Sequence, residues 1–343
     1  MGGKVQPRVR LKQGRKKQQA RSQVQPQSNN WGAPALDDWW VHARALAAFS
    51  RPHTMLGTLV GVGCVMLMAD ASVAFSRTGA FALVCALLMN VCIVGFNQVA
   101  DVRIDVFNKP YLPLASGVWS IRTGAIIAFA SGAASLLLAS ACSSLSSVHL
   151  LATLLISLAL GIAYSARTPL LRWKRSPSLA AGCILSVRAV LVQCGFFLHA
   201  QSKAGIATLT LPPQMLFATG VMAAFSVAIA LLKDTPDAAG DKLSDVRTLT
   251  VRLGTATVLR ISTGLLVAAL AGSAVLLCFN CPAGLCCKHW RRITAICTHA
   301  ALAISVAASF AAADPTSQTS LRAFYMLIWR AFYLEYLSLP LLG

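Results

Sequence analysis

The sequence predicts an all-α fold, a polytopic membrane bundle of about nine transmembrane helices. Of the 343 residues, 56% are hydrophobic and only 12% are charged, and soluble domains usually have about twice that charged fraction. Apolar runs of roughly 20 residues, long enough to cross a bilayer as a helix, recur along the chain. No run shows the alternating polar and apolar pattern of a β-strand.

Residues 1–48 are expected to form a basic tail that does not fold by itself. No acidic residue precedes Asp37, and the stretch before it is rich in Lys, Arg and Gln. Such a composition buries too little apolar surface to fold alone. It fits a targeting or membrane-surface segment better than a nucleic-acid-binding arm, and we expect no nucleic-acid partner. Residues 49–343 are then expected to form one transmembrane domain in contact with membrane lipid.

Nine apolar runs of spanning length predict the helices of this domain. The ninth is interrupted by Arg330 and Glu335. The predicted spans are 54–70, 79–98, 121–145, 148–166, 178–200, 214–233, 256–280, 293–313 and 324–342.

Two aspartate-rich loops follow the second and the sixth predicted span. With nine spans these loops lie on the same side of the membrane, together with the basic loop "SARTPLLRWKRS" after the fourth span. Lys and Arg are more frequent in these loops than in the loops of the other side, so the positive-inside rule assigns them to the cytoplasmic or stromal-equivalent face.

The first loop, "NQVADVRIDVFNKP", contains Asn97, Asp101 and Asp105 at intervals of four residues. Each step of four advances about 400° around a helix, so the three side chains share one stripe. Two carboxylates at this spacing repel each other unless a cation lies between them. Oxygen ligands of this kind suit Mg²⁺, which prefers carboxylates, water and substrate phosphates.

The second loop, "KDTPDAAGDKLSD", repeats this pattern with Asp237 and Asp241, and Asp234 precedes them. Two carboxylate sets on one face predict Mg²⁺ ions bound around a diphosphate. The nearby cations Lys109, Lys174 and Arg175 are expected to balance the remaining phosphate charge. A single such motif would more often be a helix cap or a solvated charge, but two sets on one face favour the metal site.

These loops resemble a known family. "NQVADVRID" and "DAAGD" match the two aspartate motifs of the UbiA-type membrane prenyltransferases. The resemblance implies a UbiA-like helical bundle and transfer of a prenyl group from its diphosphate to an aromatic ring. It assigns Asp101, Asp105, Asp237 and Asp241 as catalytic residues, and it places Tyr164 beside the diphosphate.

Longer stretches resemble the plant and algal homogentisate phytyltransferase branch: "FSRPHT", "NKPYLPLASG", "AYSARTPLLRWKR", "VRAVLVQCGFFLHAQ" and "YMLIWRAFYLEYLSLP". This resemblance implies phytyl or geranylgeranyl diphosphate as donor and homogentisate, which loses its carboxylate, as acceptor. The implied process is tocopherol synthesis in a plastid envelope or thylakoid membrane. Two positions depart from the family pattern: Val106 replaces a lysine, and Ala239 stands where an acid is common.

Arg188 lies near the middle of the fifth predicted span, where a cation needs a partner. The partner is either the carboxylate of homogentisate or Glu335. Gln193 and His199, further along the same span, are expected to orient the phenolic ring.

Two other functions compete with this interpretation. One is prenyl transfer to a flavonoid or another phenol. The other is an ion-coupled transporter, which would show inverted repeats and acids at the middle of the membrane. The acids here cluster at one rim, which favours the enzyme. The sequence leaves the oligomeric state open.

Overall fold

The computed structural model describes residues 39–238, 242, 248–279 and 289–342, and the described residues are helical with no strand. This confirms the all-α prediction. Within these ranges, the residues from His42 onward form one compact unit. The long helices are α3 (Pro52–Ala69), α5 (Arg77–Asn108), α6 (Ile121–Ala141), α7 (Val148–Ser165), α10 (Pro213–Leu232), α13 (Thr255–Phe279), α14 (His289–Ala311) and α15 (Gln318–Ser338).

Shorter elements connect or extend these helices. The fifth predicted span consists of α8 (Pro177–Leu185), the π-helical turn η2 (Ser186–Leu191) and α9 (Val192–Lys203). The others are α2 (Trp39–Ser50), α4 (Ala71–Ala74), α12 (Leu249–Leu253) and the 3₁₀ turns η1 (Trp173–Arg175) and η3 (Leu339–Leu342). Helix α2 includes the last part of the predicted tail, 39–48.

Eight helices in the described residues are long and apolar enough to cross a membrane. They correspond to the first eight predicted spans. The ninth predicted span forms helix α15 as well, but α15 is not among these eight. Its charged residues, including Arg322, Arg330 and Glu335, lower its hydropathy.

Local sequence signals explain where the helices begin. Ser76, Ser120, Ser147 and Ser317 cap α5, α6, α7 and α15, because each serine side chain accepts a hydrogen bond from a backbone N–H of the first turn. Helices α3, α8 and α10 begin with proline, which lacks only an N–H that the first turn leaves unpaired.

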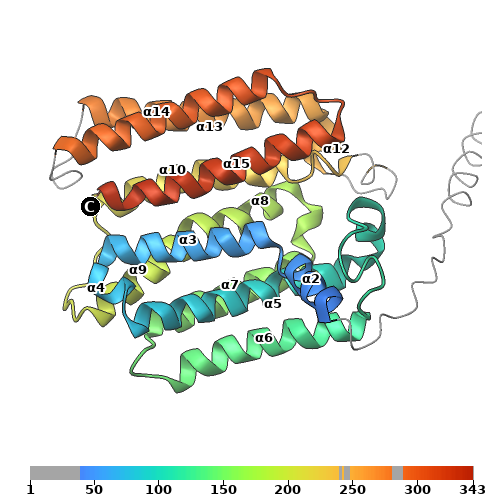
Figure 1. The fold of residues 1–343 in the computed structure, drawn as a ribbon, viewed down its shortest axis with the longest axis horizontal. Helices are drawn as coiled ribbons and strands as arrows, with labels where there is room; N and C mark the ends of the chain where they lie inside the picture. Colours follow the sequence, from blue (N-terminus) through green and yellow to red (C-terminus); the bar gives the residue numbers. More distant parts are fainter. Residues whose placement is uncertain (1–38, 239–241, 243–247, 280–288, 343) are drawn as a thin grey trace, which may run out of the picture. The chain divides into compact units, whose positions relative to one another are not determined.

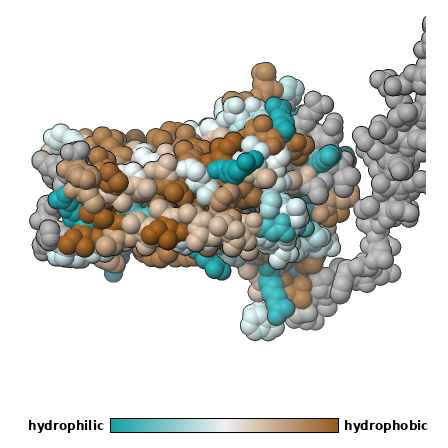
Figure 2. Space-filling view, turned by 90° about the horizontal axis from the view of Figure 1, so that it is seen from above, coloured by the Kyte–Doolittle hydropathy of each residue, from teal (hydrophilic) through white to brown (hydrophobic). Residues whose placement is uncertain are grey.

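The long helices run side by side and reverse direction at each connection (Figure 1). As a result, the ends of α5, α7 and α10 and the beginnings of α3, α8, α13 and α15 lie at the same end of the bundle. Apolar residues cover most of the length of the face in Figure 2, and hydrophilic residues gather chiefly towards the end at which α2 and α12 lie. A large apolar cluster buries residues of α3, α5, α9, α10 and α15 against one another.

Candidate active site

The predicted stripe lies on α5, which continues without a break to Asn108. Asn97 donates a hydrogen bond from its side-chain nitrogen to the hydroxyl of Ser165 at 3.0 Å, at the end of α7. Gln98 faces another way and donates to the backbone oxygen of Phe49 at 2.6 Å. The helical geometry thus separates Gln98 from the stripe.

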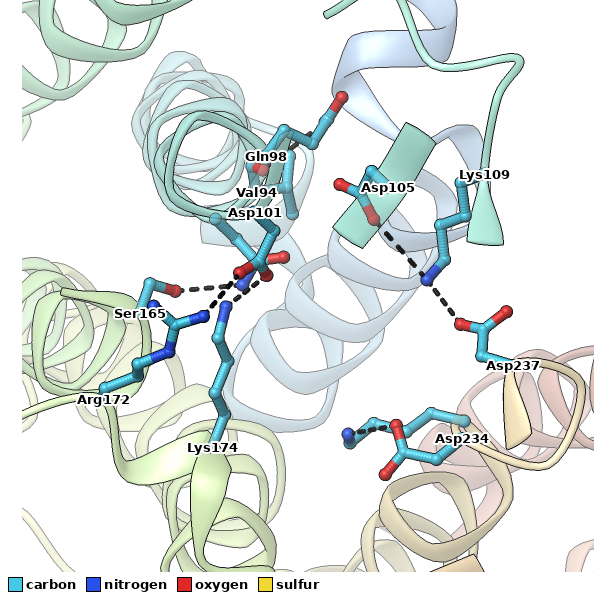
Figure 3. Close-up of polar contacts among 12 residues, drawn as sticks. Val94, Gln98, Asp101, Asp105, Lys109, Ser165, Arg172, Lys174, Asp234 and Asp237 are labelled. Atoms are coloured by element: carbon cyan, nitrogen blue, oxygen red, sulfur yellow. Dashed lines mark hydrogen bonds and ion pairs between the residues drawn. The ribbon is translucent and has the colours of Figure 1, made fainter. Parts of the chain in front are cut away.

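Lys109 connects the two aspartate motifs. Its ammonium nitrogen lies 2.5 Å from Oδ2 of Asp237 and 3.9 Å from Oδ1 of Asp105, and Figure 3 shows it between the two carboxylates. Burial opposes the charge on Lys109, but Asp237 and Asp105 outweigh burial and raise the pKa of Lys109. We call the end of the bundle that holds Asp101, Asp105, Asp234 and Asp237 the aspartate end.

Asp101 is paired with two cations from the loop after α7. Lys174 donates a hydrogen bond to Oδ2 of Asp101, and the guanidinium of Arg172 lies 3.6 Å from Oδ1. Burial lowers the pKa of Lys174 in spite of this partner. Arg175, the other predicted phosphate ligand in this loop, is exposed. Arg172 is not among the cations predicted to bind phosphate, because its left-handed φ of 63° and the following 3₁₀ turn, which decide which cations face α5, cannot be read from the spacing of the residues.

Asp234 is paired with its neighbour Lys233 at 2.6 Å. Burial opposes the charge on Lys233, yet Asp234 and Tyr164 outweigh it and raise the pKa of Lys233. The ring of Tyr164 also lies 6.0 Å from the ammonium of Lys174. Tyr164 therefore contacts two of the lysines at the aspartate end.

The second motif is attached to α15. Gln318, the first residue of α15, donates to the backbone oxygen of Pro236 at 2.8 Å. Asp237 is buried, whereas Asp241 and Ala239 lie outside the described residues. Val106 is 38% exposed, and the lysine nearest to Asp105 along the helix is Lys109, one turn later.

The aspartate end fits a hard divalent cation by its donor chemistry. Within the described ranges, no three acidic, His or Cys side chains lie close enough together to form a metal site, since lysines and an arginine lie between the aspartates. Oδ2 of Asp105 is nevertheless buried without a hydrogen-bond partner. Carboxylate and amide oxygens are the ligands that Mg²⁺ prefers, so these residues suit a Mg²⁺–diphosphate complex.

Arg188 lies on the π-helical turn η2 inside the fifth span. Its guanidinium lies 4.6 Å from the ring centroid of Trp329 on α15, a cation–π contact. Trp329 belongs to a series of neighbouring rings that we call the aromatic cluster: Tyr325, Trp329, Phe332, Tyr333 and Tyr336. A π turn within an α-helix is frequent at functional sites, and the sequence analysis did not detect this one.

Glu335 is not the partner of Arg188. Its Oε1 lies 3.1 Å from Nε2 of His299 on α14, and both side chains are fully buried. This corrects the alternative in which Glu335 neutralises Arg188. Among the described residues, no carboxylate is paired with Arg188.

Gln193 and His199 lie at different depths of α9. Gln193 donates to the hydroxyl of Tyr336 at 2.8 Å and is fully buried, so it contacts the aromatic cluster. His199 is 2.9 Å from the hydroxyl of Ser147, at the start of α7. Because Asn97 contacts the last residue of the same helix, His199 lies at the opposite end of the bundle, away from the other predicted site residues.

Comparison with known proteins identifies the family of the chain. The chain is 43% identical over 307 residues to a probable homogentisate phytyltransferase 1, chloroplastic, of Oryza sativa subsp. japonica, covering 87% of this chain and 72% of that protein. It is 36% identical over 324 residues to a homogentisate geranylgeranyltransferase of Triticum aestivum, covering 91% and 75%. A solved UbiA homologue from Archaeoglobus fulgidus, bound to DMAPP and Mg²⁺, has the same fold at 15% identity, with a TM-score of 0.58 and coverage of 86% and 98%. The model of the UbiA prenyltransferase family matches residues 54–331, and the chain therefore belongs to this family.

Proposed function

We propose that this membrane prenyltransferase transfers a phytyl group from phytyl diphosphate to homogentisate, which loses its carboxylate as CO₂. Geranylgeranyl diphosphate is the second choice of donor. The observation that supports the proposal best is the ion pair of Lys109 with Asp237 and Asp105, because it joins two aspartate motifs distant in sequence at one end of the bundle. The similar plant proteins support homogentisate as the acceptor.

In this proposal the aspartates bind metal and the cations bind phosphate. Asn97, Asp101, Asp105, Asp234, Asp237 and Asp241 are the candidate Mg²⁺ ligands. When bound, Mg²⁺ neutralises the diphosphate and so makes it a better leaving group. Lys109 and Lys174, now paired with aspartates, exchange these partners for phosphate oxygens, and Arg175 and Tyr164 complete the diphosphate site.

The acceptor is proposed to lie between Arg188 and the aromatic cluster. Arg188 is a partly buried cation inside a membrane span and has no carboxylate partner among the described residues, and the carboxylate of homogentisate would supply one. Gln193 is proposed to accept a hydrogen bond from a phenolic hydroxyl, because its Oε1 is buried without a partner. For His199, a role in binding the aromatic substrate stays a prediction from the sequence, because His199 lies at the opposite end of the bundle from the other predicted site residues.

Enclosure by the bundle has a chemical role. The allylic cation formed when diphosphate leaves would react with water, so the site must exclude it. The aromatic cluster provides apolar walls, of which Trp329, Phe332 and Tyr336 are almost fully buried. Because the similar rice protein is named chloroplastic, we propose a plastid envelope or thylakoid membrane as the location and tocopherol (vitamin E) synthesis as the process.

A direct assay tests the function. The purified protein in lipid vesicles receives Mg²⁺, homogentisate, and phytyl and geranylgeranyl diphosphate in competition. We expect more phytylated than geranylgeranylated methylquinol, and one CO₂ released for each prenyl group transferred. A phenol without a carboxylate, such as a flavonoid, is the comparison acceptor. If the folded protein prenylates only the flavonoid, homogentisate is not the acceptor. If it forms no product with any acceptor, the proposal is contradicted.

A further inference from the structure

His53, near the start of α3, faces the same indole ring as Arg188. The centroids of the His53 and Trp329 rings are 5.1 Å apart, with an edge-to-face angle of 72°. The guanidinium of Arg188 lies 4.6 Å from the Trp329 centroid. The Trp329 indole ring therefore contacts both an imidazole, which can accept a proton, and a guanidinium, which can bind an anion.

The position of His53 is fixed by its backbone. The hydroxyl of Tyr333 donates to the backbone oxygen of His53 at 2.6 Å and so attaches the start of α3 to α15. Arg51 has a left-handed φ of 53°, and its backbone oxygen accepts a 2.9 Å hydrogen bond from the Thr54 hydroxyl. Residues in such sparsely populated backbone conformations are concentrated at functional sites.

A close approach between α3 and α15 brings the rings together. A Cβ atom at Gly57, one turn after His53, would lie 3.0 Å from Cζ3 of Trp329. Glycine at this position therefore lets the indole lie against α3, within reach of the imidazole.

Among the described residues, His53 has no acidic partner, and no carboxylate forms an ion pair with its imidazole ring. In the described part of the chain, no hydrogen bond to either imidazole nitrogen is formed, so His53 is available to a bound molecule.

We infer that His53 is a catalytic residue that accepts the proton leaving the acceptor ring. The inference rests on the proposed function. Prenyl transfer breaks the C–O bond, whose electron pair leaves with the diphosphate, while a π pair of the ring forms the new C–C bond. The attacked carbon then bears both hydrogen and prenyl. An imidazole nitrogen takes that hydrogen as a proton, and the C–H pair restores the aromatic ring.

The proton is then passed to the side-chain carbon of the acceptor, which must take up one proton to become a methyl group when CO₂ leaves, while the diphosphate departs with the electron pair of its broken bond. His53 is then neutral again for the next turnover. Arg188 holds the acceptor while this occurs, and the two residues have different roles: Arg188 affects binding, and His53 affects the rate of a chemical step.

The test uses homogentisate deuterated on its ring. General base catalysis contributes about 10²–10⁴-fold, so His53→Gln is expected to lower kcat by about that factor at a nearly unchanged KM. A primary deuterium isotope effect on kcat should appear in the variant, because removal of the ring proton becomes slow. His149→Gln, on α7 at the opposite end of the bundle, is the matched control with wild-type rates and no isotope effect.

A second variant separates chemistry from folding. His53→Ala is assayed with and without added imidazole, and prenyl diphosphate binding is measured to verify the site. Recovery of activity by imidazole supports the inference. A variant that binds prenyl diphosphate but shows neither an isotope effect nor recovery would overturn it, as would full activity of His53→Gln. Wild-type protein without product in the direct assay would instead overturn the proposed function.

Discussion

The ammonium nitrogen of Lys109 lies 2.5 Å from Oδ2 of Asp237, which follows 128 residues later in the chain. The same nitrogen contacts Asp105, so one partly buried cation joins both aspartate motifs. This relationship brings the two motifs together at one end of the bundle.

Replacement of Lys109 should weaken donor binding. In Lys109→Met, the proposed phosphate contact is lost and Asp105 and Asp237 repel each other. A hydrogen bond to a charged group contributes about 1.5–3 kcal/mol, which corresponds to a decrease of kcat/KM for prenyl diphosphate of roughly 10- to 150-fold. Steady-state kinetics at saturating homogentisate measure this. Lys203→Met, at the opposite end, is the control, and equal kinetics of the two variants would contradict the assignment.

Asp101 should determine the metal requirement. Asp101→Asn keeps the size of the side chain but removes a charged ligand, so activity at low Mg²⁺ is expected to fall strongly and to recover partly as Mg²⁺ is raised. Chelation with EDTA should abolish the wild-type activity, and added Mg²⁺ should restore it. Asp314→Asn, in the exposed turn before α15, is the control. A Mg²⁺ titration that coincides with that of the wild type would remove Asp101 from the ligand set.

Arg188 should affect the acceptor and leave the donor unaffected. Arg188→Leu removes the proposed carboxylate partner, so KM for homogentisate should rise by at least about tenfold, as loss of one charged hydrogen bond implies. Binding of prenyl diphosphate should be unchanged. Arg330→Leu, an exposed arginine on α15, is the control. If both arginine variants keep the wild-type KM, the acceptor does not contact Arg188.

The buried pair of His299 and Glu335 should stabilise the packing of α14 against α15. His299→Leu leaves the Glu335 carboxylate buried without a partner, which typically costs about 3–5 kcal/mol. The double variant His299→Leu/Glu335→Leu should regain much of this stability, because no uncompensated charge remains. Unfolding of the three variants in detergent, with Glu335→Leu as the third, measures the coupling. A single His299→Leu variant as stable as the wild type would show that the pair contributes nothing.

Much of the architecture follows from hydropathy alone. Eight of the nine predicted spans meet the criteria of length and composition in the structure. The stripe of Asn97, Asp101 and Asp105 also follows from local geometry, since α5 continues through all three residues. These features depend on neighbouring residues in the chain, which a sequence displays directly.

Partner choice across the bundle does not follow from the sequence. Arg172 rather than Arg175 is paired with Asp101, because a left-handed residue and a 3₁₀ turn orient this loop. Glu335 is paired with His299 on the adjacent helix, leaving Arg188 against Trp329.

The sequence by itself determined that the chain is a helical membrane protein with two oxygen-rich motifs at one rim, because hydrophobic length and helical period are local properties. Only the tertiary structure decided that Lys109 joins those motifs, that Arg188 lies against the Trp329 ring, and that His53 contacts the same ring. Each of these contacts joins residues far apart in the chain, and their distances are set by helix packing.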